Sequence, residues 1–329
     1  MVAITHGWLP ALLIASAGVA AVTTAKAQAW KPDRNVELIL PASPGGSNDI
    51  AGRTIQKVWT ELNLLPVSSS VVNRSGGEHN VAYTYVAQRV GDAHTLGLAS
   101  TPLLVNQVEG RSQLTHGDVT PIAYLITEPM IAVTRADSSL KTGRDVVEAL
   151  RKNSAALSIA LTSSGHRVSI GMPLLKAGIT LKGVRMPAFK GGGETVTAVL
   201  GGHADLLVTS VSTSVPHIAS GKMRGLAVSA TKRLGGPLAQ VPTWQELGYT
   251  SSGSWKAVIA PKGITPAQIA YWEDIVRKTA HSDELKQYAE KNQWIIDFKG
   301  AAEMRKWLDE EFLALKSTMT ELGLVKQSQ

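Results

Sequence analysis

Glycine-rich segments that follow apolar runs hold most of the residues that could do chemistry in this chain. The first reads PASPGGSND (41–49), and its paired glycines, Gly45 and Gly46, allow a tight turn before a polar residue that can cap a helix. Free backbone amides at a helix N-terminus, aided by the helix dipole, favour a bound carboxylate or phosphate. A plain glycine turn is the alternative. Neither a Gly-Lys-Ser/Thr phosphate loop nor a G-x-G-x-x-G fingerprint stands here, so nucleotide binding is disfavoured.

Three further segments join an apolar run to a helix-like stretch: VNRSGG (72–77), LTSSGHRVS (161–169) and FKGGGET (189–195). Their hydroxyl groups and helix-start amides are neutral donors suited to a carboxylate. Arg74 and Lys190 could add positive charge, although lone surface residues of these types more often stay solvated or form weak salt bridges. In an α/β sheet, ligands bind beyond the carboxyl ends of the strands, where such loops gather. These loops are therefore the expected binding site.

A hydrolase is the main enzymatic alternative, because Ser164 and His166 stand close together in the sequence. No G-x-S-x-G elbow surrounds this serine, and a triad also needs a third group that orients the histidine. The eight histidines show no metal-ligand spacing. The acidic run 309–311 is typical of a solvated helix face. The residues thus predict a site that holds an anion and performs no catalysis.

Alternating strand-like and helix-like segments must position these loops. Apolar spacing predicts a helix between Ala51 and Leu62 and another over 81–86. The alternation favours an α/β fold with a mostly parallel sheet. The expected strands are 36–40, 67–72, 95–99, 131–134, 157–161, 184–189, 206–209 and 226–228.

Several helix ends carry clear signals. The stretch TPAQ (265–268) combines an N-cap, a proline at the first helical position and a glutamine three residues after the cap. TWQE (243–246) has the same capping-box spacing, and 301–324 predicts a charged C-terminal helix. Pro173 argues that the helix near it begins after Ser169 or is kinked there.

The N-terminus predicts export. Residues 8–22 form an apolar run, and Ala-Lys-Ala at 25–27 precedes Gln28, which together indicate a secretory signal peptide over 1–27. The run is short for a membrane helix, although residues 1–7 contain no lysine or arginine. The chain has no cysteine and a net charge of +7 from scattered basic residues, which does not favour nucleic acid as a partner.

An ordered series of short motifs resembles the Bug family, the periplasmic substrate-binding proteins of tripartite tricarboxylate transporters. The motifs begin with PGG-x-x-D (44–49) and NR-x-GG (73–77), and they continue through DAHTL (92–96), PAFKGG (187–192), GGHAD (201–205), GKMRGLAV (221–228) and VPT-x-x-E (241–246). Each motif alone is weak, but the series spans nearly the whole chain after the predicted signal peptide.

The resemblance implies a type II periplasmic-binding-protein fold, in which two α/β domains enclose a ligand cleft. Its boundaries map to 28–128 plus 251–329 for domain one and to 129–250 for domain two. It further implies a monomer in the periplasm that needs no cofactor or metal. Its expected partners are a small di-, tri- or aromatic carboxylate and the membrane subunits of a transporter. Use as a signalling domain stays open beside transport.

The same resemblance assigns ligand-binding roles to residues of the cleft. They are Ser43, Gly45, Gly46 and Asp49 on one side, Ser100 and Thr101 in the cleft, Ser163, Ser164, Gly165 and Ser169 on the opposite wall, and Phe189 and Asp205 at its flank. Three departures from the family pattern fall here: Ala42 replaces a phenylalanine, Phe189 replaces a tyrosine, and Arg167 stands where small residues are frequent. The room beside Ala42 suggests a bulkier or aromatic carboxylate.

Overall fold

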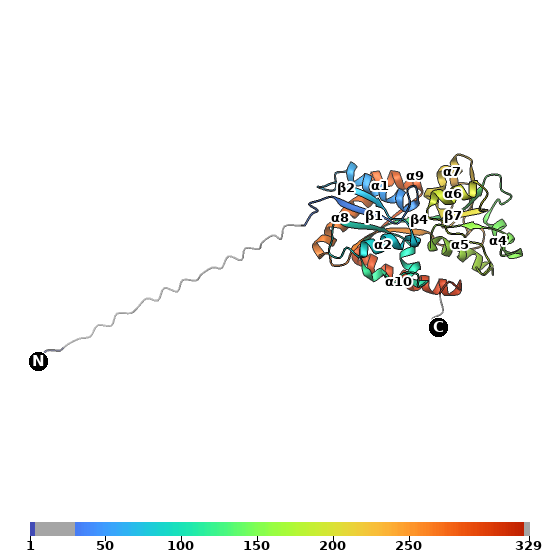
Figure 1. The fold of residues 1–329 in the computed structure, drawn as a ribbon. Helices are drawn as coiled ribbons and strands as arrows, with labels where there is room; N and C mark the ends of the chain where they lie inside the picture. The colour runs from blue at the N-terminus through green and yellow to red at the C-terminus, as the bar shows by residue number, and fades with distance from the viewer. Residues whose placement is uncertain (4–29, 326–329) are drawn as a thin grey trace.

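The computed structural model describes residues 1–3 and 30–325 and shows two α/β lobes side by side (Figure 1). The predicted signal peptide, 1–27, lies outside the described residues except for its first three positions. Within the described ranges, every helix is too short or too polar to cross a membrane.

Lobe one is built on a six-stranded sheet with the order β10-β4-β9-β3-β1-β2. Its strands are short and rich in buried apolar side chains, and these pack into two hydrophobic clusters. One cluster contains Trp59 and Trp272, and the other contains Tyr83 and Trp255. The strands are β1 (Val36–Leu40), β2 (Ser69–Asn73), β3 (Thr95–Ala99), β4 (Val119–Glu128), β9 (Ser254–Pro261) and β10 (Ile295–Gly300).

Lobe two has a four-stranded sheet with the order β6-β7-β5-β8. Its strands are β5 (Met130–Arg135), β6 (Ile159–Ala160), β7 (Leu206–Ser210) and β8 (Met223–Val228). The expectation of a mostly parallel sheet is wrong, because five of the eight strand pairings are antiparallel. All five antiparallel pairings involve β4, β9 or β5. In the sequence, β4 leads into lobe two, β5 follows it directly, and β9 is the first strand after the chain returns to lobe one.

Ten α-helices cover these sheets in the described part of the chain (Figure 1). Those of lobe one are α1 (Ser47–Glu61), α2 (Asn80–Ala87), α3 (Pro102–Val108), α8 (Pro266–His281), α9 (Asp283–Asn292) and α10 (Ala301–Glu321). Those of lobe two are α4 (Gly143–Lys152), α5 (Ser164–Lys176), α6 (Gly192–Leu200) and α7 (Val211–Ala219). The long helix α10 contacts both α3 and α5, so it touches both lobes.

Most predicted elements form, with the following differences. The predicted strand 67–72 begins two residues later, at Ser69. The predicted strand 184–189 makes only isolated bridges, at Arg185 and Ala188. The TWQE box forms its two reciprocal bonds, Glu246 N to Thr243 Oγ1 at 3.0 Å and Thr243 N to Glu246 Oε2 at 2.9 Å, but only a turn follows. The TPAQ box does begin a helix, α8.

Helix α5 begins at Ser164 and continues through Pro173, so the expectation of a start after Ser169 is wrong. A proline inside a helix deprives the carbonyl four residues earlier of its N–H partner. Here that carbonyl belongs to Ser169, and the hydroxyl of Ser251 donates to it at 2.8 Å. The connection between the lobes therefore satisfies the group that Pro173 leaves free.

The two lobes join through two strand connections. One passes directly from Glu128 at the end of β4 through Pro129 into β5, and the other leads from β8 to β9. The domain boundaries given by the family resemblance, 28–128 plus 251–329 and 129–250, stay a prediction.

Candidate ligand-binding site between the lobes

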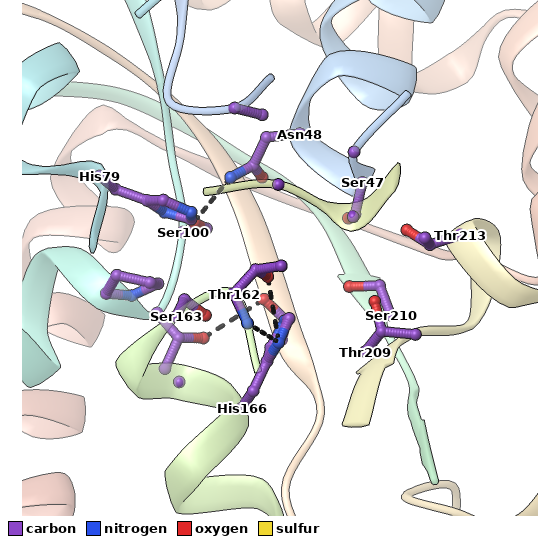
Figure 2. A pocket seen from close by; sticks show the side chains of 18 of the residues that line it. Ser47, Asn48, His79, Ser100, Thr162, Ser163, His166, Thr209, Ser210 and Thr213 are labelled. Atoms are coloured by element: carbon purple, nitrogen blue, oxygen red, sulfur yellow. Dashed lines mark hydrogen bonds between the residues drawn. The ribbon is translucent and has the colours of Figure 1, made fainter. Parts of the chain in front are cut away.

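A narrow cavity lies between the two lobes, where the loops after several strands face one another (Figure 2). It contains about 570 Å³ of space free of protein atoms when its mouth is included, and the centre of a water molecule can occupy about 40 Å³ of it. The lining is mainly small and polar. It comprises Ala42, Ser43, Gly46, Ser47, Asn48, His79, Ser100, Thr101, Pro102, Met130, Thr162, Ser163, Gly165, His166, Lys190, Gly191, Gly192, Thr209, Ser210, Thr213, Gly253, Ser254 and Lys256.

Six helices of the described chain have an N-cap residue that lines this cavity, among them α1, α5 and α6. The N-cap residues of α1, α5 and α6 are Gly46, Ser163 and Gly191, and all three line it. In these described helices, no N-cap side chain occupies the first-turn amides. Such amides lack intrahelical partners and sit at the positive end of the helix dipole. The cavity is therefore suited to an anion.

The opening loop is held in shape by Asp49. The carboxylate of Asp49 accepts hydrogen bonds from the Gly45 amide at 2.9 Å, from Arg53 Nε at 2.9 Å and from Asn73 Nδ2 at 2.8 Å. Gly45 adopts a left-handed φ of 79°, which glycine tolerates best. Asp49 and Gly45 thus shape the turn behind the cavity, while Gly46 and Ser43 face it.

Six of the twelve predicted ligand residues line the cavity: Ser43, Gly46, Ser100, Thr101, Ser163 and Gly165. The other six are placed around it rather than in its wall. Gly45 and Asp49 shape the turn, Ser164 donates to Asn106 Oδ1 at 2.7 Å, Ser169 donates to the Ser252 carbonyl at 2.9 Å, Phe189 packs in the core of lobe two, and Asp205 accepts from the Ser158 amide at 2.7 Å. Their direct contact with a ligand stays a prediction.

One wall of the cavity is formed by Asn48, Ser100 and His79 (Figure 2). Asn48 Nδ2 donates to Ser100 Oγ at 3.2 Å, which leaves Asn48 Oδ1 buried without a hydrogen-bond partner among the described residues. Buried polar atoms without partners are rare and costly. This oxygen can accept a hydrogen bond from a ligand or from water in the cavity.

His79 is held in the cavity wall by unusual backbone geometry. Gly76, Gly77, Glu78 and His79 all have positive φ, with values of 118°, 55°, 50° and 82°. A left-handed φ is uncommon for residues other than glycine, and such strain is often found at functional sites. His79 Nδ1 is buried without a hydrogen-bond partner in the described structure. Burial is the largest cause that lowers the pKa of His79 to about 3, and the proximity of His166 and Lys256 contributes to this lowering.

His166 is fixed in a neutral form by its own loop. The Thr162 amide donates to His166 Nδ1 at 3.3 Å, so the ring carries its proton on Nε2 (Figure 2). Burial lowers the pKa of His166 to about 3. Because Nδ1 is bound to Thr162 and the Ser164 hydroxyl to Asn106, the two residues do not form the nucleophile pair that a hydrolase would need.

A buried ion pair lies where the two strand connections meet. Lys256 Nζ is 3.0 Å from Glu128 Oε2, and the exposed fractions of the two side chains are 2% and 0%. Glu128 also accepts hydrogen bonds from Ser47 in lobe one, from Ser212 in lobe two and from Trp294 Nε1 at 3.1 Å. Burial opposes ionisation of Glu128, but the positive charge of Lys256 and the hydrogen bonds from Ser212 and Ser47 hold the pKa of this carboxyl below its usual value. Glu128 therefore links both lobes as a carboxylate.

The lobes are in close contact around the cavity. A Cβ atom on Gly191 would lie 2.7 Å from Ser43 Cβ in the other lobe, and one on Gly165 would lie 3.2 Å from Thr101 Cβ. Arg167 reaches from α5 to Glu109 at 2.9 Å and to Glu78 at 3.4 Å. The structure is therefore a closed arrangement.

The basic residues that the sequence singled out have other roles. Arg167 belongs to the ion pairs between the lobes, and Arg74 stacks on the Tyr85 ring at 3.5 Å from its centroid. Lys190 lines the cavity from an exposed position at its rim. The buried cation of the wall is Lys256, which sequence reasoning missed. The only signal was a lysine within the apolar run WKAVIAP.

The described residues contain no cluster of histidine and carboxylate side chains that could hold a metal ion.

Two α/β lobes closed around a polar cavity define a solute-binding protein of the periplasmic type. The chain belongs to the tripartite tricarboxylate transporter receptor family, whose model matches residues 62–324. It is 28% identical over 261 residues to protein BugT of Bordetella pertussis, covering 78% of each chain.

Solved structures share the fold. An R. palustris protein with adipate superposes with a TM-score of 0.81 at 22% identity, covering 89% of this chain and 99% of that one. MatC from Rhodopseudomonas palustris, with bound malate, gives a TM-score of 0.76 at 21% identity over 87% of this chain and 99% of that one.

Proposed function

We propose that this chain captures a small organic carboxylate in the interlobe cavity and delivers it to the membrane subunits of a tripartite tricarboxylate-type transporter. The observation that carries the proposal is the convergence of several helix N-termini, including those of α1, α5 and α6, on one hydroxyl-rich cavity. Backbone amides and hydroxyl groups donate hydrogen bonds that a carboxylate accepts.

The surroundings of the cavity support binding without chemistry. Ser164 and His166 are each engaged elsewhere, and the lobes meet closely enough to enclose a small ligand. Adipate and malate in two structures of the same fold give the size of carboxylate to test first. Export to the periplasm, a monomeric state and the absence of a cofactor belong to the same proposal.

The test is calorimetry on the purified chain with adipate, malate, citrate, benzoate, phthalate and a neutral sugar. We expect one or more carboxylates to bind with micromolar or tighter affinity and the sugar not to bind. Binding of benzoate or phthalate would show that the room beside Ala42 admits an aromatic ring. Mass spectrometry of ligand released from the denatured, freshly exported protein provides an independent identification. Failure of every carboxylate to bind, with another solute found in the released fraction, would contradict the proposal.

A further inference from the structure

Lys256 is the buried cation of the cavity wall. Its strand, β9, lies between β4 and β3 in the six-stranded sheet, and its side chain is 2% exposed. Burial of an ammonium group to this degree is costly unless the charge is compensated. The remaining basic side chain of the lining, Lys190, is at the exposed rim. Among the described lining residues, Lys256 is therefore the one lysine whose charge lies inside the cavity.

The ammonium group of Lys256 has unused hydrogen-bonding capacity. It has three N–H donors. Its partners in the described structure are Glu128 Oε2 at 3.0 Å and, at the long distance of 3.5 Å, Ser254 Oγ. One donor is therefore available to an acceptor in the cavity that Lys256 lines.

Glu128 does not depend on Lys256 alone. Its Oε1 accepts from the Ser212 hydroxyl, the Ser212 amide at 3.3 Å and Trp294 Nε1 at 3.1 Å, and its Oε2 also accepts from the Ser47 hydroxyl. A carboxylate with this many donors is stable as an anion. The charge of Lys256 can therefore be shared with a second acceptor without leaving Glu128 unsatisfied.

Neutral donors surround this cation. His166 presents a neutral ring with its proton on Nε2, and His79 has a free buried Nδ1. Both rings are close enough to Lys256 for its charge to lower their pKa values. Neutral imidazoles contribute hydrogen bonds but no second full charge.

We propose that Lys256 makes the cavity selective for an ionised ligand. Its ammonium group binds one carboxylate group of the ligand directly, between the neutral rings of His79 and His166. This inference rests on the proposed function and adds a specificity rule to it. The ligand must carry an ionised acid at this position, while the rest of the molecule meets neutral donors only. An amide at the same position would lose the charge-assisted bond.

The test compares adipate with adipamide, its neutral diamide, and malate with malamide, by calorimetry on the wild-type chain and on two variants. The K256Q/E128Q variant replaces the ion pair by two hydrogen-bonding amides, so no buried carboxylate is left without its partner. K262Q is the matched control, because Lys262 follows the same strand, pairs with Asp118 at 2.9 Å and does not line this cavity. Circular dichroism and melting curves establish that each variant is folded.

A charge-assisted hydrogen bond of about 1.5–3 kcal/mol corresponds to a loss of about ten- to a hundredfold in affinity. We expect K256Q/E128Q to lose this much affinity for the diacid and to discriminate the diacid from the diamide by correspondingly less than the wild type does, and K262Q to match the wild type. A crystal structure of the wild type with adipate or malate gives a second readout, in which Lys256 Nζ should lie within hydrogen-bonding distance of a carboxylate oxygen. Unchanged affinity in the folded double variant, or a carboxylate distant from Nζ, would overturn this inference alone. If no carboxylate binds the wild type, the proposed function and this inference both fail.

Discussion

Ser164 illustrates how a residue next to a reactive-looking neighbour can have a structural role. Its hydroxyl donates to Oδ1 of Asn106, whose exposed fraction is 0%. Asn106 Nδ2 in turn donates to the Glu78 carbonyl at 2.8 Å, so this amide connects α5 with the left-handed segment in the other lobe. The serine therefore contributes to the wall of the cavity through the residue behind it.

We predict that Ser164→Ala lowers the free energy of unfolding by about 1–2 kcal/mol, because Asn106 Oδ1 loses its donor while it stays buried. Ligand affinity should change by less than about threefold, since Ser164 does not line the cavity. Urea denaturation and calorimetry measure the two effects. S220A, which removes an exposed hydroxyl bound only to the His217 carbonyl, is the control. A variant with normal stability and no ligand binding would contradict this prediction.

Six lining residues of the cavity could be predicted from the loop motifs and the family resemblance, and two of them are glycines. Gly46, the N-cap of α1, and Gly165, in the first turn of α5, follow from the glycine-rich loops, because a glycine presents only its backbone to the cavity and has no side chain to orient. The orientation of Asn48, His79 and Lys256 depends on tertiary contacts, which no local pattern shows. Asp49 belongs to the predicted motif, but its carboxylate accepts hydrogen bonds from three donors behind the loop and does not line the cavity. Its orientation likewise could not be predicted from the motif.

At the scale of elements, the closed cavity depends on the approach of the 190–192 loop to the opening loop. Ser43 Oγ donates to the Lys190 carbonyl at 3.4 Å, and Gly191 leaves no space for a side chain against Ser43. A larger residue at position 191 would have to separate the lobes.

We predict that Gly191→Ala weakens ligand binding at least about tenfold, because closure would place the new methyl group 2.7 Å from Ser43 Cβ. The fold of each lobe should survive, since the clash arises only between lobes. Gly193→Ala is the matched control: it changes the first turn of the same helix, where a Cβ would meet no atom within 4 Å. Calorimetry and small-angle scattering check the result, and equal affinity in the two variants would contradict it.

The helices and most short strands were predictable, whereas the sheet topology was not. Caps, glycine turns and apolar spacing are local signals, and they predict α1, α8 and α10 well. The direction of β4 and β9 is set by the passage of the chain between lobes, and neither strand was predicted. Because Glu128 and Lys256 lie on those two strands, the ion pair was missed together with them.

At the scale of the whole molecule, the two histidines of the cavity wall link stability to pH. Burial lowers the pKa of His79 and of His166 to about 3, whereas a histidine in the unfolded chain has its ordinary pKa of about 6.5. Below about pH 6.5 the unfolded chain therefore binds protons that the folded chain does not, and stability falls as the pH decreases. The decrease continues until the folded rings also titrate, near their lowered pKa.

We predict a loss of about 1–3 kcal/mol in the free energy of unfolding between about pH 7.5 and about pH 5.5. Urea denaturation at the two pH values measures it. The H79N/H166N variant should show a clearly smaller difference; asparagine is suitable because it tolerates the left-handed backbone at position 79. Burial raises the pKa values of Glu109 and Glu311, so their protonation increases the free energy of unfolding as the pH decreases, at lower pH than the histidine effect. An equal pH dependence in the variant would contradict the assignment to these rings.

The left-handed segment 76–79 has a consequence for how this protein can diverge in evolution. His79 lines the cavity, its neighbour Glu78 forms an ion pair with Arg167 in the other lobe, and the same left-handed backbone positions both side chains. A mutation at position 79 that alters ligand preference also changes the backbone strain beside Glu78, and with it the balance between open and closed lobes. New specificities should therefore emerge together with changes in capture and release, and compensating substitutions are expected at the partners of Arg167.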